Sequence, residues 1–215
     1  MALVGIAPAT MRPTALALNI LVATIVTARF QLAGHVAWRA VVPFVIASVP
    51  AAFIGGTLVL PSNIYKPVVG IVLIIAAIQL FRSARQAGML EQPPTNVPLL
   101  PALLAGGAIG LLAGLTGTGG GIFLTPLIIV AGWSGARTAA GISAAFILAN
   151  SISGLAGNLT SLGTLPAQLP VLLAVVGVGA LVGSELGARR LNLPNLRRAL
   201  ALVLVIAGLK LIFLG

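Results

Sequence analysis

The chain is a succession of apolar runs, each about 20 residues long and nearly free of charged residues. A helix rises 1.5 Å per residue, so a run of this length crosses the hydrocarbon core of a bilayer. Charged residues make up only 7% of the chain, and the mean hydropathy is +1.17. These observations predict membrane helices rather than a soluble core. The runs lie near 13–31, 40–60, 66–82, 138–158, 168–188 and 196–214.

With the segment 98–131 added, the runs predict an all-α fold, a polytopic transmembrane helical bundle of about seven or eight membrane segments. The longest polar connector, 83–97, contains Pro93-Pro94 and separates two halves. We divide the chain into a first repeat at 1–82, a connecting loop at 83–97 and a second repeat at 98–215.

The two halves resemble each other in sequence. "MRPTALALNI" at 11–20 matches "ARTAAGISAA" at 136–145, which places Arg12 opposite Arg137. Internal repeats are the usual construction of secondary transporters, and we expect these two to be inverted in the membrane. In this alignment Met1 falls opposite Pro126, so the first half begins just after the point where a partner of the glycine motif should stand. We therefore expect the first repeat to lack its own glycine-motif segment because the start is truncated.

A cluster of small residues interrupts the apolar segment 98–131. Residues 117–121 read Gly-Thr-Gly-Gly-Gly, and consecutive glycines at about 1 kcal/mol each should unwind a helix. Unwound backbone at membrane depth is tolerated only inside protein or against a water-filled cavity. We expect a hairpin of two half-helices, because this arrangement gathers nine of the twelve bases on one face, which the positive-inside rule makes cytoplasmic. The nine are Arg29, Arg39, Arg82, Arg85, Arg137, Arg189, Arg190, Arg197 and Arg198.

The glycine turn is the candidate binding site. A helix N-terminus presents unpaired amides and about half a positive charge, and side-chain-free backbone lets an oxyanion approach closely. The alternative is that these glycines only permit tight helix packing, which we expect for Gly106, Gly107, Gly110 and Gly114. A packing role for Gly110 predicts that Gly110→Ala weakens anion binding far less than Gly120→Val does, when equal amounts of folded protein are compared. No lysine follows the glycines, so a phosphate-binding P-loop is excluded.

A few polar side chains inside the apolar runs complete the candidate site. Intramembrane polar groups serve either a transport pathway or hydrogen bonding between helices, and both interpretations stay open here. Ser151 and Ser153 are among them, and the spacing of Glu185 and Arg189 suggests an ion pair within one helix. The predicted substrate-binding residues are Thr116, Gly117, Thr118, Gly119, Gly120, Gly121, Asn150 and Asn19, with Arg137 and Arg12 as residues that attract anions.

The rest of the composition excludes several classes of protein. The chain has no cysteine, one histidine and two acids, from which neither a catalytic triad nor the usual metal centre can be assembled. We expect no enzyme activity, no cofactor and no metal. The net charge of +10 comes from bases between apolar spans, which indicates orientation in the membrane rather than a nucleic-acid partner.

The motif "GLLAGLTGTGGGIFLTPLII", followed by "ARTAAGISAAF" and "NLTSLGTLP", resembles the second half of the sulfite exporter TauE/SafE family. Gly117, Gly119, Gly120, Gly121 and Pro126 carry the resemblance, which covers essentially the whole chain. It implies a multi-pass permease of the cell (inner) membrane that moves sulfite, sulfonates or related organosulfur anions. The absent first glycine motif departs from the family pattern.

The resemblance and the repeats together predict alternating access around the glycine turn. The expected partners are a small anionic substrate, the lipid bilayer and a second copy of the chain in a homo-oligomer. Two alternatives remain at this point: a transporter of another small anion such as a carboxylate, and a truncated remnant that does not transport.

Overall fold

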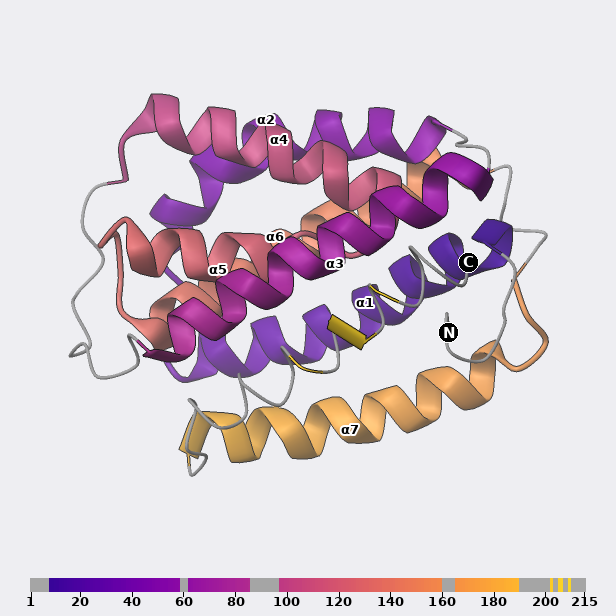
Figure 1. Cartoon of the computed structure of the whole chain (residues 1–215). Helices are drawn as coiled ribbons and strands as arrows, with labels where there is room; N and C mark the ends of the chain where they lie inside the picture. The colour runs from indigo at the N-terminus through magenta and orange to yellow at the C-terminus, as the bar shows by residue number, and fades with distance from the viewer. Residues whose placement is uncertain are drawn as a thin grey trace.

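The computed structural model describes residues 8–58, 62–85, 97–159 and 165–189, together with the isolated positions 202, 205, 206 and 209. Within these residues the chain is a bundle of α-helices without strands (Figure 1). The all-α prediction is confirmed, and the predicted span at 196–214 lies almost entirely outside the described residues. The helices are α1 (Pro8–Leu32), α2 (Trp38–Thr57), α3 (Ser62–Arg85), α4 (Leu99–Thr116), α5 (Gly121–Val130), α6 (Ala136–Gly157) and α7 (Leu169–Arg189).

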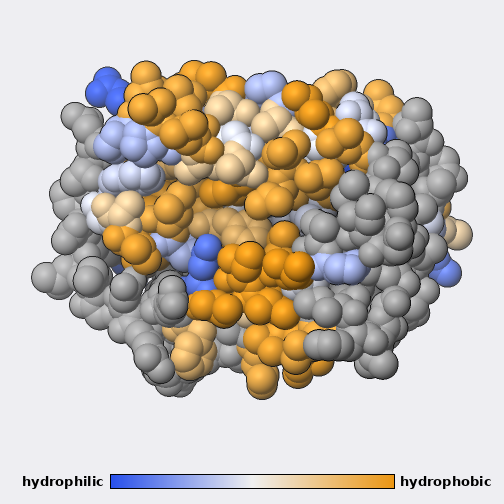
Figure 2. Space-filling view, turned by 45° about the horizontal axis from the view of Figure 1, so that its top comes forward, coloured by the Kyte–Doolittle hydropathy of each residue, from blue (hydrophilic) through white to orange (hydrophobic). Residues whose placement is uncertain are grey.

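The outer surface of the bundle is apolar. Within the described residues four helices, α1, α2, α4 and α6, are long and apolar enough to cross a membrane. Large apolar side chains point outward, for example Val171, Val175 and Val178 on α7, each more than 60% exposed. Apolar residues also cover most of the described surface visible in Figure 2. Exposure on this scale suits lipid rather than water, so this is a multi-pass membrane protein.

Three glycines of α4 form a stripe that packs directly on the backbone of α2. A side chain at Gly106, Gly110 or Gly114 would meet the backbone of Phe44, Ser48 or Ala52, respectively. The contacts advance together along both helices, so α2 and α4 run parallel. The packing prediction is confirmed for these three glycines. Gly107 differs, because a methyl there would meet only the Ala47 side chain, at 3.8 Å.

The segment 98–131 is a helical hairpin, as the charge distribution predicted. The Ser153 hydroxyl donates to the Val49 carbonyl, and Gly157 lies against Phe53, so α6 runs parallel to α2 and α4. Gly121 lies against Ile147 of α6, whereas Thr125, one turn later, donates to Ser143. α5 therefore runs antiparallel to α6 and back along the direction from which α4 came (Figure 1).

The helix directions bring basic residues together at one end of the bundle. α1, α3, α5 and α7 finish at the end where α2, α4 and α6 begin (Figure 1). Arg29 lies in the last turn of α1, Arg39 in the first turn of α2 and Arg137 in the first turn of α6. α1 and α6, the helices matched by the internal repeat, run in opposite directions, since Leu16 lies near Gly154 and Phe30 near Gly141. That direction agrees with inverted repeats, which remain a prediction.

An aromatic cluster holds α2 and α6 to the loop after α5. The Phe44 ring is 6.5 Å from Phe146 in an edge-to-face arrangement and 6.0 Å from Trp133. Phe44 and Phe146 are fully buried, and each aromatic pair adds about 0.5–1.5 kcal/mol beyond its buried area. The cluster fixes α6, one wall of the glycine turn.

Candidate functional site

The backbone between α4 and α5 adopts a conformation that only glycine takes readily. Gly117, Gly119 and Gly120 have φ angles of 77°, 72° and 80°, in the left-handed region. Gly117 caps the end of α4, and its amide donates to Ala113, while Gly120 caps the start of α5. A side chain at these positions would cost about 1–2 kcal/mol in backbone strain alone. The predicted helix break is therefore a defined turn.

The turn presents a row of unsatisfied amides. In the described part of the chain, the backbone N–H groups of Thr118, Gly119, Gly120, Gly121 and Ile122 donate no hydrogen bond to protein. Gly119, Gly120 and Gly121 are buried, and buried amides in protein are paired in more than 90% of cases. Successive amides in left- and right-handed conformations at a helix start form an anion-binding concavity. The turn therefore has the geometry of an oxyanion site.

Polar side chains from α1 and α6 reach the same turn. The Asn19 amide donates to the Gly117 carbonyl at 3.1 Å, so it holds the turn from the α1 side. The Ser151 hydroxyl lies 3.1 Å from the position that a Cβ on Gly119 would take. Ser151 is fully buried, and its hydroxyl has no hydrogen-bond partner within the described residues. The Ser151 hydroxyl can therefore donate a hydrogen bond to a ligand at the turn and accept one from it.

Asn150, the neighbouring residue on α6, is also fully buried, and neither its amide nitrogen nor its amide oxygen has a partner in the part of the chain described. It lies on the helix stripe between Phe146, whose ring adjoins Gly120, and Gly154, which adjoins Gly114 of α4. Residues four apart share a helix face, so Asn150 faces the inside of the bend. An unsatisfied amide in an apolar interior costs about 1–3 kcal/mol.

The two threonines predicted to bind substrate contact each other. Thr116 donates to the Leu112 carbonyl at 2.6 Å, and its oxygen lies 2.9 Å from the Thr118 hydroxyl. Because Thr116 has one proton and uses it on Leu112, Thr118 is the donor in this pair. In this conformation both protons are engaged within the protein. The donors at the turn that lack a protein partner in the described part of the chain are therefore the turn amides and the Ser151 hydroxyl.

The two arginines predicted to attract anions lie in different places. Arg12 is buried beside Gly117, and its guanidinium donates to the carbonyls of Gly56 and Leu58 at the end of α2. Its charge thus stabilises the negative end of the α2 dipole. Arg137 is exposed in the first turn of α6, at least six residues, or about 9 Å of helix, from the residues that contact the turn.

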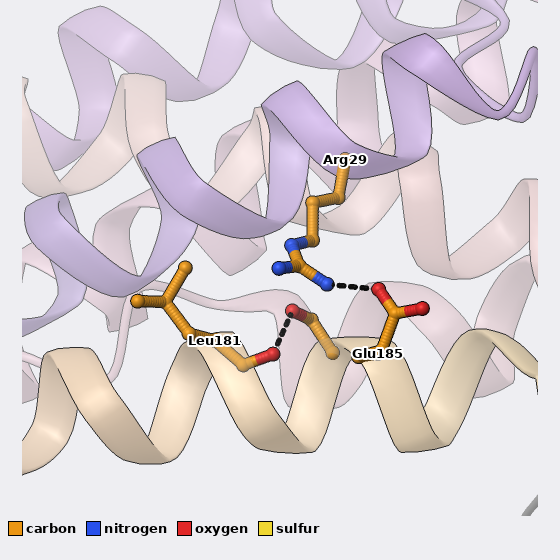
Figure 3. Close-up of polar contacts among 4 residues, drawn as sticks. Arg29, Leu181 and Glu185 are labelled. Carbon is orange, nitrogen blue, oxygen red and sulfur yellow. Dashed lines mark hydrogen bonds and ion pairs between the residues drawn. The ribbon is translucent and has the colours of Figure 1, made fainter.

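An ion pair joins α1 to α7 at the basic end of the bundle. Arg29 Nη1 contacts Glu185 Oε2, as Figure 3 shows, with 34% and 47% of the two side chains exposed. The sequence spacing suggested Arg189 as the partner of Glu185, and the Arg189 side chain lies outside the described residues. The pair links helices assigned to different repeats.

Some features of the site were visible in the sequence and others were not. The structure brings Asn19 to the glycine turn, although it is 98 residues from Gly117, and Asn150 lies next to Ser151, which adjoins Gly119. Ser48 of α2 was missed: it is fully buried with an unpartnered hydroxyl, and no local pattern distinguishes it from a packing serine. No group of metal-ligating side chains occurs within the described ranges.

Comparisons with known proteins identify one family and two relatives that are named as membrane transporters. Residues 1–211 match the sulfite exporter TauE/SafE family. A Sinorhizobium fredii protein named probable membrane transporter protein y4hK is 42% identical over 99% of this chain and 87% of its own length. A Methanocaldococcus jannaschii protein named probable membrane transporter protein MJ0441 is 29% identical over 81% of this chain and 68% of its own. No solved structure matches. The chain therefore belongs to the sulfite exporter TauE/SafE family and is a membrane transporter, not an enzyme.

Proposed function

We propose that this transporter carries a small oxyanion, with sulfite and organic sulfonates as its substrate class, and binds it at the glycine turn. The family name points to sulfite. We take the protein to lie in the inner membrane, where the positive-inside rule favours an orientation with its basic end in the cytoplasm. The observation that carries the proposal is the row of five unpaired amides in the buried turn between α4 and α5.

The amides make this site selective for anions. They stand at the N-terminus of α5, where the helix dipole places about half a positive charge. Each hydrogen bond from an amide to a charged oxygen contributes about 1.5–3 kcal/mol. Several such bonds are needed to offset the loss of hydration when an anion enters an apolar bundle. A cation gains nothing from these donors.

The position of the turn suits alternating access. Ser151, which adjoins Gly119, lies six residues before the end of α6, about 9 Å along the helix, and fifteen residues, about 22 Å, from its start. The site is therefore inside the bundle, nearer to the end opposite Arg29, Arg39 and Arg137. α1 lies on one side of the turn and α6 on the other, so movement of the first repeat against the second would open the turn to one face at a time.

A pair of serine variants tests the site. Ser151→Ala removes a hydroxyl that has no protein partner, so the thermal stability should be unchanged or higher while sulfite affinity falls about tenfold. Ser153→Ala, on the same helix, removes the hydrogen bond to Val49 and should lower stability by about 1 kcal/mol with no effect on affinity. Affinity is measured by calorimetry on protein in nanodiscs, and flux with labelled sulfite in vesicles.

The opposite pattern, in which Ser153→Ala weakens sulfite binding and Ser151→Ala does not, would move the site away from the turn. Competition with acetate decides between substrate classes: if acetate displaces sulfite at equal concentration, the site takes carboxylates as well as sulfur oxyanions.

A further inference from the structure

Besides the turn amides, the buried side chains of Ser48, Asn150 and Ser151 have polar atoms without a hydrogen-bond partner in the described residues. Some of these atoms are hydrogen-bond acceptors, which an oxyanion without a donor cannot satisfy. The turn amides only donate hydrogen bonds. Asn150 leaves both an NH₂ donor and a carbonyl acceptor unpaired, and Ser48 and Ser151 leave hydroxyls that donate and accept. Because both amide atoms of Asn150 are unpartnered, this observation holds whichever way the amide is oriented.

Ser48 and Asn150 lie at nearly the same depth in the bundle. α2 and α6 are parallel, and Ser153 contacts Val49, so Asn150 is level with Ile46, two residues from Ser48. Two residues correspond to about 3 Å of helix rise. Ser48 faces Gly110 of α4, and Asn150 lies on the α6 stripe that faces the bend. Ser48 and Asn150 therefore provide hydrogen-bond acceptors as well as donors at one depth of the bundle, on the α2 side of the turn.

Few charged groups lie at the turn. The turn amides and the side chains of Asn19 and Ser151 that reach the turn are neutral, and Asn150, next to Ser151 on α6, is neutral as well. Arg12, whose Cγ lies beside Gly117, carries a charge. Arg12 directs its guanidinium to the end of α2, and Glu185 is on α7 with Arg29. The cost of moving an ion into low dielectric rises with the square of its charge, so a dianion costs about four times as much as a monoanion of the same size. Half a helix charge and neutral donors match a single negative charge.

We infer, building on the proposed function, that the substrate is a singly charged oxyanion that also carries an O–H or N–H donor, and that Asn150 recognises this donor. Such a ligand places its charged oxygens on the turn amides and its donor on the Asn150 carbonyl. Hydrogen sulfite and hydroxy- or amino-substituted sulfonates have this chemistry. A ligand that has no hydrogen-bond donor leaves the Asn150 oxygen buried and unpaired. Because an unpaired buried oxygen is unfavourable, a polar site of this kind rejects analogues that lack a donor.

The experiment compares 2-hydroxyethanesulfonate, 1-propanesulfonate and sulfate on the full chain in nanodiscs, by displacement of labelled sulfite. The two sulfonates have the same number of heavy atoms and the same charge, and they differ only in the hydroxyl. We expect the hydroxylated sulfonate to bind about tenfold more tightly than 1-propanesulfonate, and sulfate to bind more weakly than either. In Asn150→Leu both sulfonates weaken, and the ratio of their affinities falls to about one.

The ratio is measured within each variant, so partial loss of folded protein does not affect it. Asn158→Leu, at the buried residue that caps the end of α6 about two turns beyond Asn150, serves as the matched amide-to-leucine control and should keep the wild-type ratio. Equal affinity for the two sulfonates in the wild type, or a ratio that survives in Asn150→Leu, overturns the inference and indicates that water satisfies Asn150. Neither result affects the proposed anion site, which fails only if no sulfonate or sulfite binds or if Ser151→Ala leaves binding intact.

Discussion

The glycines of α4 and the glycines that follow this helix have two different roles, although Gly114 and Gly117 are only three residues apart. Gly106, Gly110 and Gly114 are helical, and each lies where the backbone of α2 occupies the space of a side chain. Gly117 and Gly120 have left-handed backbone, and the turn around them carries unpaired amides. The first set brings two helices together, and the second ends one helix and begins another. The neighbour across the contact, not the residue type, decides which role a glycine has.

The distance from each glycine to its neighbours predicts how much stability is lost when the glycine is replaced by alanine. In Gly114→Ala the new Cβ would lie 2.9 Å from the Gly56 nitrogen and nearer still to the Ala52 carbonyl oxygen. Backbone cannot move aside as a side chain can, so we expect a loss of about 3 kcal/mol or more in stability and little folded protein. Gly107→Ala, with only Ala47 at 3.8 Å, should be neutral or stabilising by up to about 1 kcal/mol.

Folded yield and thermal midpoint in detergent measure both variants. Equal yields would mean that the stripe is not a close backbone contact. Gly110→Ala should also lower stability, because its Cβ would lie 2.5 Å from the Ser48 carbonyl oxygen and 2.6 Å from the Ser48 Cα. Gly107, rather than Gly110, is the correct control for variants of the turn.

Chemical labelling tests whether the turn reverses the chain. The protein has no native cysteine, so single cysteines can be placed at Leu99, Gly132 and Leu159. A hairpin predicts all-or-none labelling in which Leu99→Cys and Gly132→Cys react from the same side of the membrane and Leu159→Cys from the other. If Leu99→Cys and Gly132→Cys react from opposite sides, α4 and α5 form one interrupted crossing and the predicted gathering of arginines is lost.

A substitution inside the turn should affect binding more than folding. In Gly119→Ala the φ of 72° strains the backbone, and the methyl meets the ends of Ile147, Ser151 and Asn19 at 2.8–3.2 Å. Side-chain ends can give way, so we expect a stability loss of about 1–3 kcal/mol, smaller than for Gly114→Ala. Sulfite affinity should fall more than tenfold, because at least one amide hydrogen bond is displaced. Calorimetry on the folded fraction separates the two effects.

The smallest expected effect concerns the contact between α1 and α7. Arg29 and Glu185 are about one-third and one-half exposed, and ion pairs of this kind contribute between 0 and about 1 kcal/mol after screening. Arg29→Gln should therefore change the thermal midpoint by no more than a few degrees and leave sulfite affinity unchanged. A large change in transport rate at unchanged stability would instead show that this pair controls the movement between repeats.

Much of the fold could be predicted from the sequence. Spans of about 20 apolar residues give helices of membrane length, because backbone hydrogen bonds must be satisfied internally in lipid. The expected helices near 13–31 and 138–158 became Pro8–Leu32 and Ala136–Gly157, with shifts only at the ends. The glycine run at 117–121 predicted the break, because consecutive glycines cannot hold a helix together. The positive-inside rule, applied to the arginines, predicted that α5 runs back antiparallel to α4.

Only the tertiary structure decided which groups meet at the turn. Sequence periodicity gives the face of a helix but not the element that it contacts, so the pairing of Asn19 with Gly117 and of Arg29 with Glu185 could not be read from spacing. The same limit hid the difference between Gly107 and Gly110, which depends on the distance to the α2 backbone. It also hid the unsatisfied state of Asn150 and Ser151, since a missing hydrogen-bond partner is a property of the packed bundle and not of the chain.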